Sequence, residues 1–212
     1  MQQLNILIVG ANGQLGRYLI KYIIEGNHHT AVALVNNAVQ QAYFMEMGVA
    51  TLTIDVNQKV TDIVKLLKKM DALVITGSLN EQNKETLIEL DEMLKLLDAA
   101  RYASLSRILY VSTFEIQPLP LYFRSIFVKR HYIEKWLKCS YSNFTIIQAG
   151  TLVDKKGTGL VEIGSKVKNK ETSKEDVAQF ILACLENEAT IRKTIKVVSG
   201  KTPIQQAIQS IT

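Results

Sequence analysis

The sequence has 212 residues, enough for one α/β domain with a substantial core and short for two. Hydrophobic residues make up 47% and charged residues 21%, which is ordinary globular usage and excludes extensive disorder. The formal net charge of +5 suits an anionic ligand but is too diffuse to indicate a nucleic-acid-binding protein.

The two cysteines, Cys139 and Cys184, form no motif typical of metal binding, redox chemistry or a disulfide framework. Both fall in apolar helical stretches, so we expect them to be buried. The N-terminus has no signal-peptide pattern, and no apolar run reaches the roughly 20 residues that cross a bilayer. We therefore expect a cytoplasmic protein without a metal, a membrane or a nucleic acid among its ligands.

Strand-like and helix-like segments alternate along the chain. Apolar runs predict strands at residues 4–9, 31–35, 49–54, 72–76, 107–111 and 144–148. Helical patterns between them lie at residues 14–25, 38–47, 60–69, 85–103 and 125–139. Later segments predict a strand at 160–163, a helix at 174–186, a strand at 195–199 and a short helix from 202. The alternation predicts one Rossmann-type domain, residues 1–212, with a doubly wound parallel sheet and a small substrate-side part from about residue 150.

Three glycines with GxxGxxG spacing lie between the first strand and the first helix. The first permits a tight exit from the strand, the second lets a pyrophosphate approach, and the third lets the helix pack on the sheet. The alternative is a glycine-rich turn without a ligand, but the helix N-terminus behind this turn favours an anion. We predict an NAD(P) site made by Gly10, Asn12, Gly13, Gln14, Leu15 and Gly16.

Three further strand ends are expected at the cofactor. Asn36 follows the second strand, where a carboxylate would favour NAD and an arginine NADP; Arg17 is a nearby cation that would favour NADP. Asp55, beside Val56, either accepts a hydrogen bond from the adenine amino group or is a solvated loop carboxylate. The fourth strand ends in small residues that we also expect to contact the cofactor, Thr76, Gly77 and Ser78.

These features resemble the atypical short-chain dehydrogenase/reductase family, and more narrowly its small, NAD(P)-binding, NmrA-like bacterial members. The resemblance spans nearly the whole chain. It rests on the glycine spacing and on residues 54–56, 111–113, 125–130, 143–150 and 172–178. It implies a Rossmann fold, NAD(P) as cofactor and oxidoreductase chemistry.

In that family a tyrosine protonates the substrate carbonyl, and a lysine four residues later orients the nicotinamide ribose and lowers the tyrosine pKa. Lys129 matches the lysine, but the tyrosine position holds Ser125, a far weaker acid. Tyr122 would share the helical face of Lys129 if the helix began early; otherwise it is a packing residue. Ser112 matches a family serine that polarises a carbonyl, although a strand-end structural role fits equally. The resemblance thus implies Lys129, Ser112 and Tyr122 as catalytic candidates, with Lys129 also at the cofactor.

Other departures and polar residues bear on the site. The family's arginine at the end of the sixth strand is Gln148 here, which removes a cation from the substrate side. We expect His28 and His29 in an exposed turn, and His131 on the helix surface away from Lys129.

Two functions remain open. The first is an NAD(P)H-dependent reductase of a small carbonyl, quinone or flavin-like acceptor, because hydride transfer depends chiefly on the cofactor and solvent can supply the proton. The second is a catalytically inactive dinucleotide sensor that reports redox state to a protein partner. The missing tyrosine and arginine favour the sensor, whereas the family resemblance favours the oxidoreductase.

Overall fold

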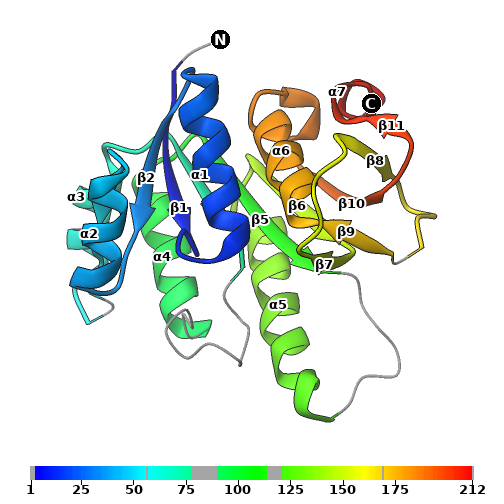
Figure 1. Ribbon diagram of the computed structural model, residues 1–212. Coiled ribbons are helices and arrows are strands. Elements are labelled where there is room, and N and C mark those ends of the chain that lie inside the picture. Colours follow the sequence, from blue (N-terminus) through cyan, green and yellow to red (C-terminus); the bar gives the residue numbers. More distant parts are fainter. Residues whose placement is uncertain (1–2, 56, 78–89, 114–120, 169, 212) are drawn as a thin grey trace.

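The computed structural model describes residues 3–55, 57–77, 90–113, 121–168 and 170–211, without the side chains of residues 121–127. Within these residues a nine-stranded sheet forms the centre of the molecule, with helices on both faces (Figure 1). Along the sheet the strands follow in the order β11 (Thr202–Pro203), β8 (Leu160–Ile163), β10 (Lys193–Ser199), β6 (Phe144–Ala149), β5 (Arg107–Thr113), β4 (Ala72–Ile75), β1 (Asn5–Val9), β2 (Thr30–Leu34) and β3 (Ala50–Leu52).

Every pairing from β10 to β3 is parallel, so the predicted doubly wound sheet is confirmed for this part. Its strand order is that of a Rossmann sheet with β10 added beyond β6. The expectation that all strands run parallel is wrong at the edge, where β8 runs antiparallel to β10 and β11. A parallel strand needs a crossover connection, usually a helix, that brings the chain back to the end of the sheet where the preceding strand began. No helix lies between β6 and β8, so β8 runs in the opposite direction.

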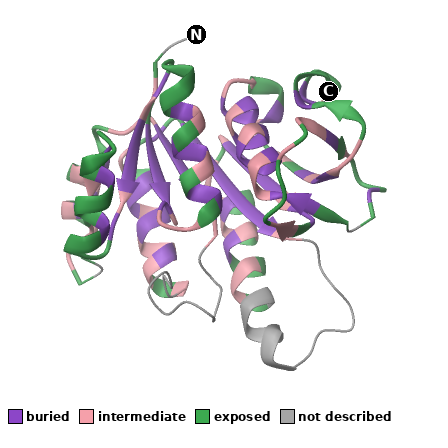
Figure 2. Ribbon diagram, in the orientation of Figure 1, coloured by how far each residue is buried: buried purple, intermediate pink, exposed green. Residues whose placement is uncertain are grey.

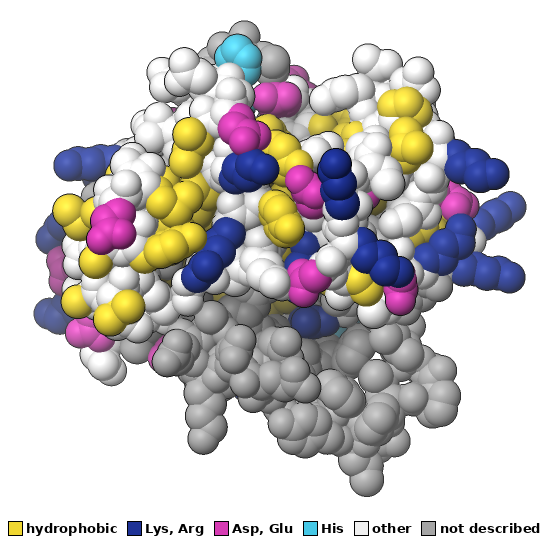
Figure 3. Space-filling view, viewed as in Figure 1, with side chains coloured by type: hydrophobic (Ala, Val, Ile, Leu, Met, Phe, Trp, Pro, Cys, Tyr) yellow, Lys and Arg dark blue, Asp and Glu magenta, His cyan; other side chains and the backbone are white. Residues whose placement is uncertain are grey.

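Helices cover the sheet on both sides. One layer holds α1 (Gln14–Gly26), α2 (Ala38–Glu46), α6 (Lys174–Leu185) and α7 (Ile204–Gln209). The other holds α3 (Val60–Leu67), α4 (Leu90–Tyr102) and α5 (Leu121–Ser140). The strands between the layers are largely buried, and the outer helix surfaces are exposed (Figure 2). On the outside, apolar side chains gather over α1 and α2, and Lys and Arg side chains surround the C-terminal part (Figure 3).

The C-terminal half differs from the prediction in several places. Residues 202–203 form β11, so the last helix begins at Ile204 rather than at 202. A small parallel pair, β7 (Thr151–Val153) and β9 (Glu171–Ser173), lies beside the carboxyl end of β6, and a short 3-10 helix covers Glu188–Thr190. Gly150 makes the pair possible, because a Cβ there would lie 2.2 Å from the Lys170 carbonyl oxygen. Helix α5 begins at Leu121, four residues earlier than the pattern indicated.

Two burial expectations are wrong. Cys184 is buried as expected, but Cys139 is exposed, because it lies about 200° around α5 from the buried Leu137. His29 is buried rather than exposed: the Leu4 amide donates to its Nδ1 at 3.3 Å, and its Nε2 lies 3.4 Å from Glu186 Oε1. The end of α6 covers the turn that holds this ring.

Candidate functional site

The glycine turn leaves β1 and enters α1 at the carboxyl edge of the sheet (Figure 1). Gly10 adopts a φ of +81°, and its carbonyl oxygen accepts a 3.0 Å hydrogen bond from the Gly13 amide. Gly13 is the N-cap of α1 in an extended conformation. The turn is therefore closed by its own backbone.

The three glycines are required for different reasons. A Cβ on Gly10 would lie 2.4 Å from the Gly77 carbonyl oxygen, and one on Gly16 would lie 2.4 Å from the Gly10 carbonyl oxygen. A Cβ on Gly13 would meet only the Gly10 carbonyl oxygen, at 3.3 Å. Packing of the protein thus requires the first and third glycines, whereas the second leaves space that the rest of the turn does not fill.

The N-terminus of α1 fits a diphosphate. Its N-cap residue, Gly13, makes no side-chain capping hydrogen bond, and the first turn of α1 holds no acidic residue. The first-turn amides of a helix have no partner within the helix, and the helix dipole places positive potential there. Leu15 packs in the core, so only its backbone faces the turn, while Gln14 is exposed. The predicted residues therefore fit NAD(P) through their backbone.

The end of β4 holds the glycine turn in place through Thr76. The buried Thr76 hydroxyl donates to the carbonyl oxygens of Val9, at 3.0 Å, and Gly10, at 3.3 Å. Its hydroxyl is thus used to hold β1 and β4 together. Gly77 has a φ of +108° with open space around its Cβ direction. Ser78 lies outside the described residues, so its predicted role stays a prediction.

The adenosine side carries the other predicted residues. Asn36 is exposed, and its backbone N–H donates to Gln40 Oε1 at 3.0 Å, which ties the end of β2 to α2. Asp55 is exposed, and its Oδ1 accepts a 2.8 Å hydrogen bond from the backbone N–H of Asn57, which is a turn that loop carboxylates commonly make. Val56 lies outside the described residues. The proposed contacts of these residues with the cofactor stay predictions.

Arg17 is held in place on this side of the turn. Its Nε donates to the Asn12 carbonyl oxygen at 3.0 Å, and its Nη2 donates to Asn12 Oδ1 at 2.7 Å. The guanidinium lies 4.6 Å from the ring centroid of Tyr43 on α2, a cation–π distance. Asn12 therefore orients Arg17, a contact that the sequence did not predict, and its own contact with the cofactor stays a prediction.

The catalytic candidates lie on β5 and α5. Ser112 is buried near the carboxyl end of β5. Lys129 is half-buried and shares a helical stripe with the buried Ile133 and Leu137, which turns this stripe toward the sheet. The side chains of Tyr122 and Ser125 are not among the described parts of the structure, but the early start of α5 places both positions in the helix. The proposed roles of Ser112, Lys129 and Tyr122 stay predictions.

Arg130 is a site residue that sequence reasoning missed. Its Nη1 donates to the Thr113 hydroxyl at the end of β5. Burial lowers the pKa of this guanidinium, and nearby Tyr110 and Glu134 act in the opposite direction. Gln148, which replaces the family's arginine, instead donates to both Glu134 carboxylate oxygens at 3.3 Å. A cation therefore remains near this edge but comes from α5. Arg130 directly follows Lys129 in the stretch 125–130 on which the family resemblance rests, although no role in the site was predicted for it.

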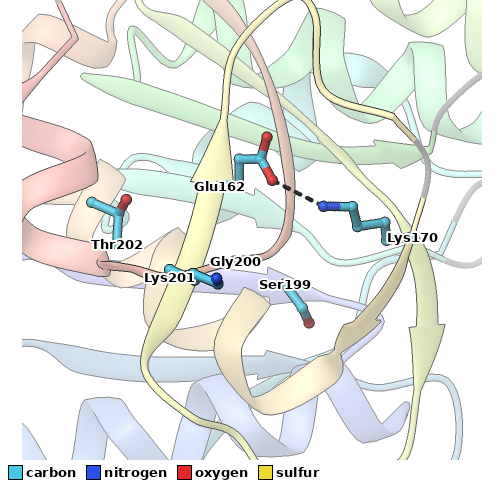
Figure 4. A pocket seen from close by; sticks show the side chains of 6 residues that line it. All are labelled: Glu162, Lys170, Ser199, Gly200, Lys201 and Thr202. Carbon is cyan, nitrogen blue, oxygen red and sulfur yellow. Dashed lines mark hydrogen bonds and ion pairs between the residues drawn. The ribbon is translucent and has the colours of Figure 1, made fainter.

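The C-terminal part adds a shallow hollow of about 470 Å³, shown in Figure 4. It is lined by Glu162, Lys170, Ser199, Gly200, Lys201 and Thr202. The Lys170 ammonium lies 3.0 Å from Glu162 Oε2, so one of the two lysines that line the hollow forms an ion pair within it. The hollow lies over β8 and β10, which are five and four strands along the sheet from β1, and it is therefore separate from the glycine turn.

Two kinds of feature are absent from the described part of the chain. No helix there is long and apolar enough to cross a membrane. The same residues hold no group of three or more His, Cys, Asp or Glu side chains placed to bind a metal ion.

A Rossmann sheet with an uncapped, glycine-rich entry into its first helix defines a dinucleotide-binding protein. Residues 10–188 match the model of the family described as NAD(P)H-binding, and the chain belongs to this family. The predicted fold and the NAD(P) cofactor class are thereby confirmed.

Similar proteins agree with this assignment. The UPF0659 protein YMR090W of Saccharomyces cerevisiae is 31% identical over 227 residues, covering all of both chains. A Bacillus subtilis protein named uncharacterized sugar epimerase YhfK is 27% identical, and the match covers 98% of this chain and 100% of that protein. The structure of the oxidoreductase YlbE from Lactococcus lactis superposes with a TM-score of 0.81 at 26% identity. The superposition covers 98% of this chain and 96% of that one.

These findings confirm the resemblance to atypical short-chain dehydrogenases/reductases, as NAD(P)-binding proteins of an oxidoreductase- and epimerase-like kind. The narrower restriction to NmrA-like bacterial members is not confirmed, since a yeast protein matches over its full length.

Proposed function

We propose that this protein is an NAD(P)H-dependent reductase of a small acceptor, most simply a quinone or a flavin-like ring. The observation that carries the proposal is a pair of cations on α5 near the carboxyl end of β5. Lys129 lies on the stripe of α5 that faces the sheet, and Arg130 donates a hydrogen bond to the Thr113 hydroxyl. The bound cofactor would supply the hydride. The fold and the family support the cofactor; the acceptor is our inference.

Each residue would have a limited task. Lys129 would bind the nicotinamide ribose and hold the ring at the end of β5. The Ser112 hydroxyl would donate a hydrogen bond to the acceptor oxygen. Arg130, oriented by Thr113, would stabilise negative charge that develops on the acceptor. Since Ser125 is a poor acid, solvent would deliver the proton.

This division of tasks favours one substrate class. Reduction of an isolated carbonyl creates a localised alkoxide, which needs a proton donor as it forms. Reduction of a quinone or a flavin spreads the new charge over a conjugated ring, which positive charge alone can stabilise. A site with two cations and without the family tyrosine suits the second class.

The test begins with cofactor binding and proceeds to turnover. Purified protein is titrated with NADH and NADPH, and then assayed for oxidation of each with quinones, flavins and simple carbonyl compounds. A nucleotide sugar joins the panel because one relative is named a sugar epimerase. Lys129→Ala should weaken binding and turnover, whereas Lys135→Ala, on the exposed side of α5, should change neither.

The second candidate is a dinucleotide sensor without catalysis, for which Ser125 at the acid position is the specific support. Firm NAD(P)H binding without turnover across the panel would favour the sensor and a protein partner. Failure to bind either dinucleotide would contradict both proposals. Both remain compatible with the expected cytoplasmic location.

A further inference from the structure

One cation from the C-terminal part reaches the glycine turn. Lys174 is the first residue of α6, and α6 packs side by side with α1 (Figure 1). Its ammonium donates to Oε1 of Gln14, the first residue of α1, and lies 2.8 Å from Asp154 Oδ1. The Lys174 side chain is 20% exposed, whereas that of Asp154 is 55% exposed. The lysine side chain therefore points toward the N-terminal end of α1, beside the glycine turn, and is partly shielded from water.

The position is electrostatically unfavourable without an anion. A helix N-terminus carries positive potential, so a nearby ammonium is repelled there. The first turn of α1 offers no carboxylate in compensation. The carboxylates next to Lys174 are used elsewhere: Glu175 accepts from the Gly157 amide at 2.7 Å, and Asp176 accepts from two amides of the same loop. Asp154, largely in water, is the compensating charge that the structure shows.

We propose that Lys174 binds the diphosphate of the dinucleotide, so that α6 completes the site formed by the glycine turn. A phosphate oxygen at the α1 N-terminus would lie between two groups that both attract it, the helix amides and the ammonium. Asp154 then holds the lysine in place until the ligand arrives. This inference rests on the dinucleotide site and is independent of the proposed reductase activity.

The test measures affinity without any acceptor. NADH and ADP-ribose, which shares the diphosphate but lacks nicotinamide, are titrated into wild type and Lys174→Met. The variant should bind both ligands about tenfold more weakly, as expected for loss of one charge-assisted hydrogen bond to phosphate. Lys155→Met is the matched control, because Lys155 pairs with Glu171 on the exposed surface of the same segment. It should leave both affinities unchanged.

Asp154→Asn separates ligand binding from structural support. It removes the ion pair but keeps the ammonium, so affinity should stay equal or rise. If it weakens binding as much as Lys174→Met does, the lysine only ties α6 to the loop, and the proposal is overturned. Unchanged ADP-ribose affinity in Lys174→Met would overturn it too. Should Lys174→Met fail to fold, as seen by circular dichroism, the Asp154→Asn result still decides, because weaker binding contradicts the proposal and equal or tighter binding supports it.

Discussion

The glycine turn makes a prediction that separates stability from binding. Gly13 has a φ of −70° and a ψ of 157°, which any residue adopts, and a Cβ there would meet one oxygen at 3.3 Å. Replacing Gly13 by Val removes chain flexibility from the unfolded state but weakens the N-cap, and these effects oppose each other. We expect the free energy of unfolding to change by less than about 1 kcal/mol.

The same substitution at Gly16 should behave in the opposite way. Its Cβ would lie 2.4 Å from the Gly10 carbonyl oxygen and 2.7 Å from the Ala11 Cα, both backbone atoms that cannot rotate away. Helix α1 would have to move off the turn, and overpacking of this kind costs about 1–3 kcal/mol. Gly16→Val is therefore the destabilising control, measured by urea denaturation beside wild type.

Dinucleotide affinity completes the comparison. The branched side chain of Gly13→Val would occupy the space of the diphosphate, so affinity for NADH should fall at least about a hundredfold, or 2.7 kcal/mol. Binding is followed by NADH fluorescence on protein whose folding has been verified. Unchanged affinity in Gly13→Val would refute the assignment of the site. An unchanged free energy of unfolding in Gly16→Val would refute the packing argument.

Three further predictions concern selectivity, catalysis and pH. Wild type should discriminate between NADH and NADPH by less than about tenfold, or 1.4 kcal/mol, and Arg17→Ala should weaken NADPH more than NADH; a wild-type preference above a hundredfold would contradict this. Ser125→Ala should leave any reductase rate nearly unchanged, whereas a hundredfold loss in Tyr122→Phe at unchanged cofactor affinity would restore a tyrosine acid. A backbone amide and a tyrosine hydroxyl lower the pKa of Glu175, so its stabilisation is present above the ordinary glutamate pKa of about 4.3 and is lost as pH falls through the lower folded-state value. The stability advantage of wild type over Glu175→Gln should accordingly shrink only in acid, which urea denaturation at several pH values can measure.

Local patterns predicted most of the fold because each element carries its own signal. The run before Gly10 and the spacing of the three glycines identify β1, the turn and α1 without any knowledge of the rest of the chain. The same holds for α6, where Ser173 caps the helix by accepting from the Glu175 and Asp176 amides. These features depend on residues within a few positions of one another.

Contacts between distant segments could not be predicted in this way. Gln14 and Lys174 are 160 positions apart, and Thr113 and Arg130 are 17 positions apart across an element boundary. Neither pair has a spacing that marks it, since their contact follows from which helix packs beside which strand. The burial of His29 by the end of α6 has the same origin.

The glycine motif itself carries less functional information than its three positions suggest. The packing of Gly10 against Gly77 and of Gly16 against Gly10 would keep both glycines in a chain of this fold that had lost its cofactor. Of the three motif glycines, Gly13 is the one at which the protein leaves room that a ligand would need. A Rossmann sequence with the first and third glycines but a bulky second residue would therefore predict the fold without the dinucleotide, and the presence of Gly13 here is what links the fold to binding.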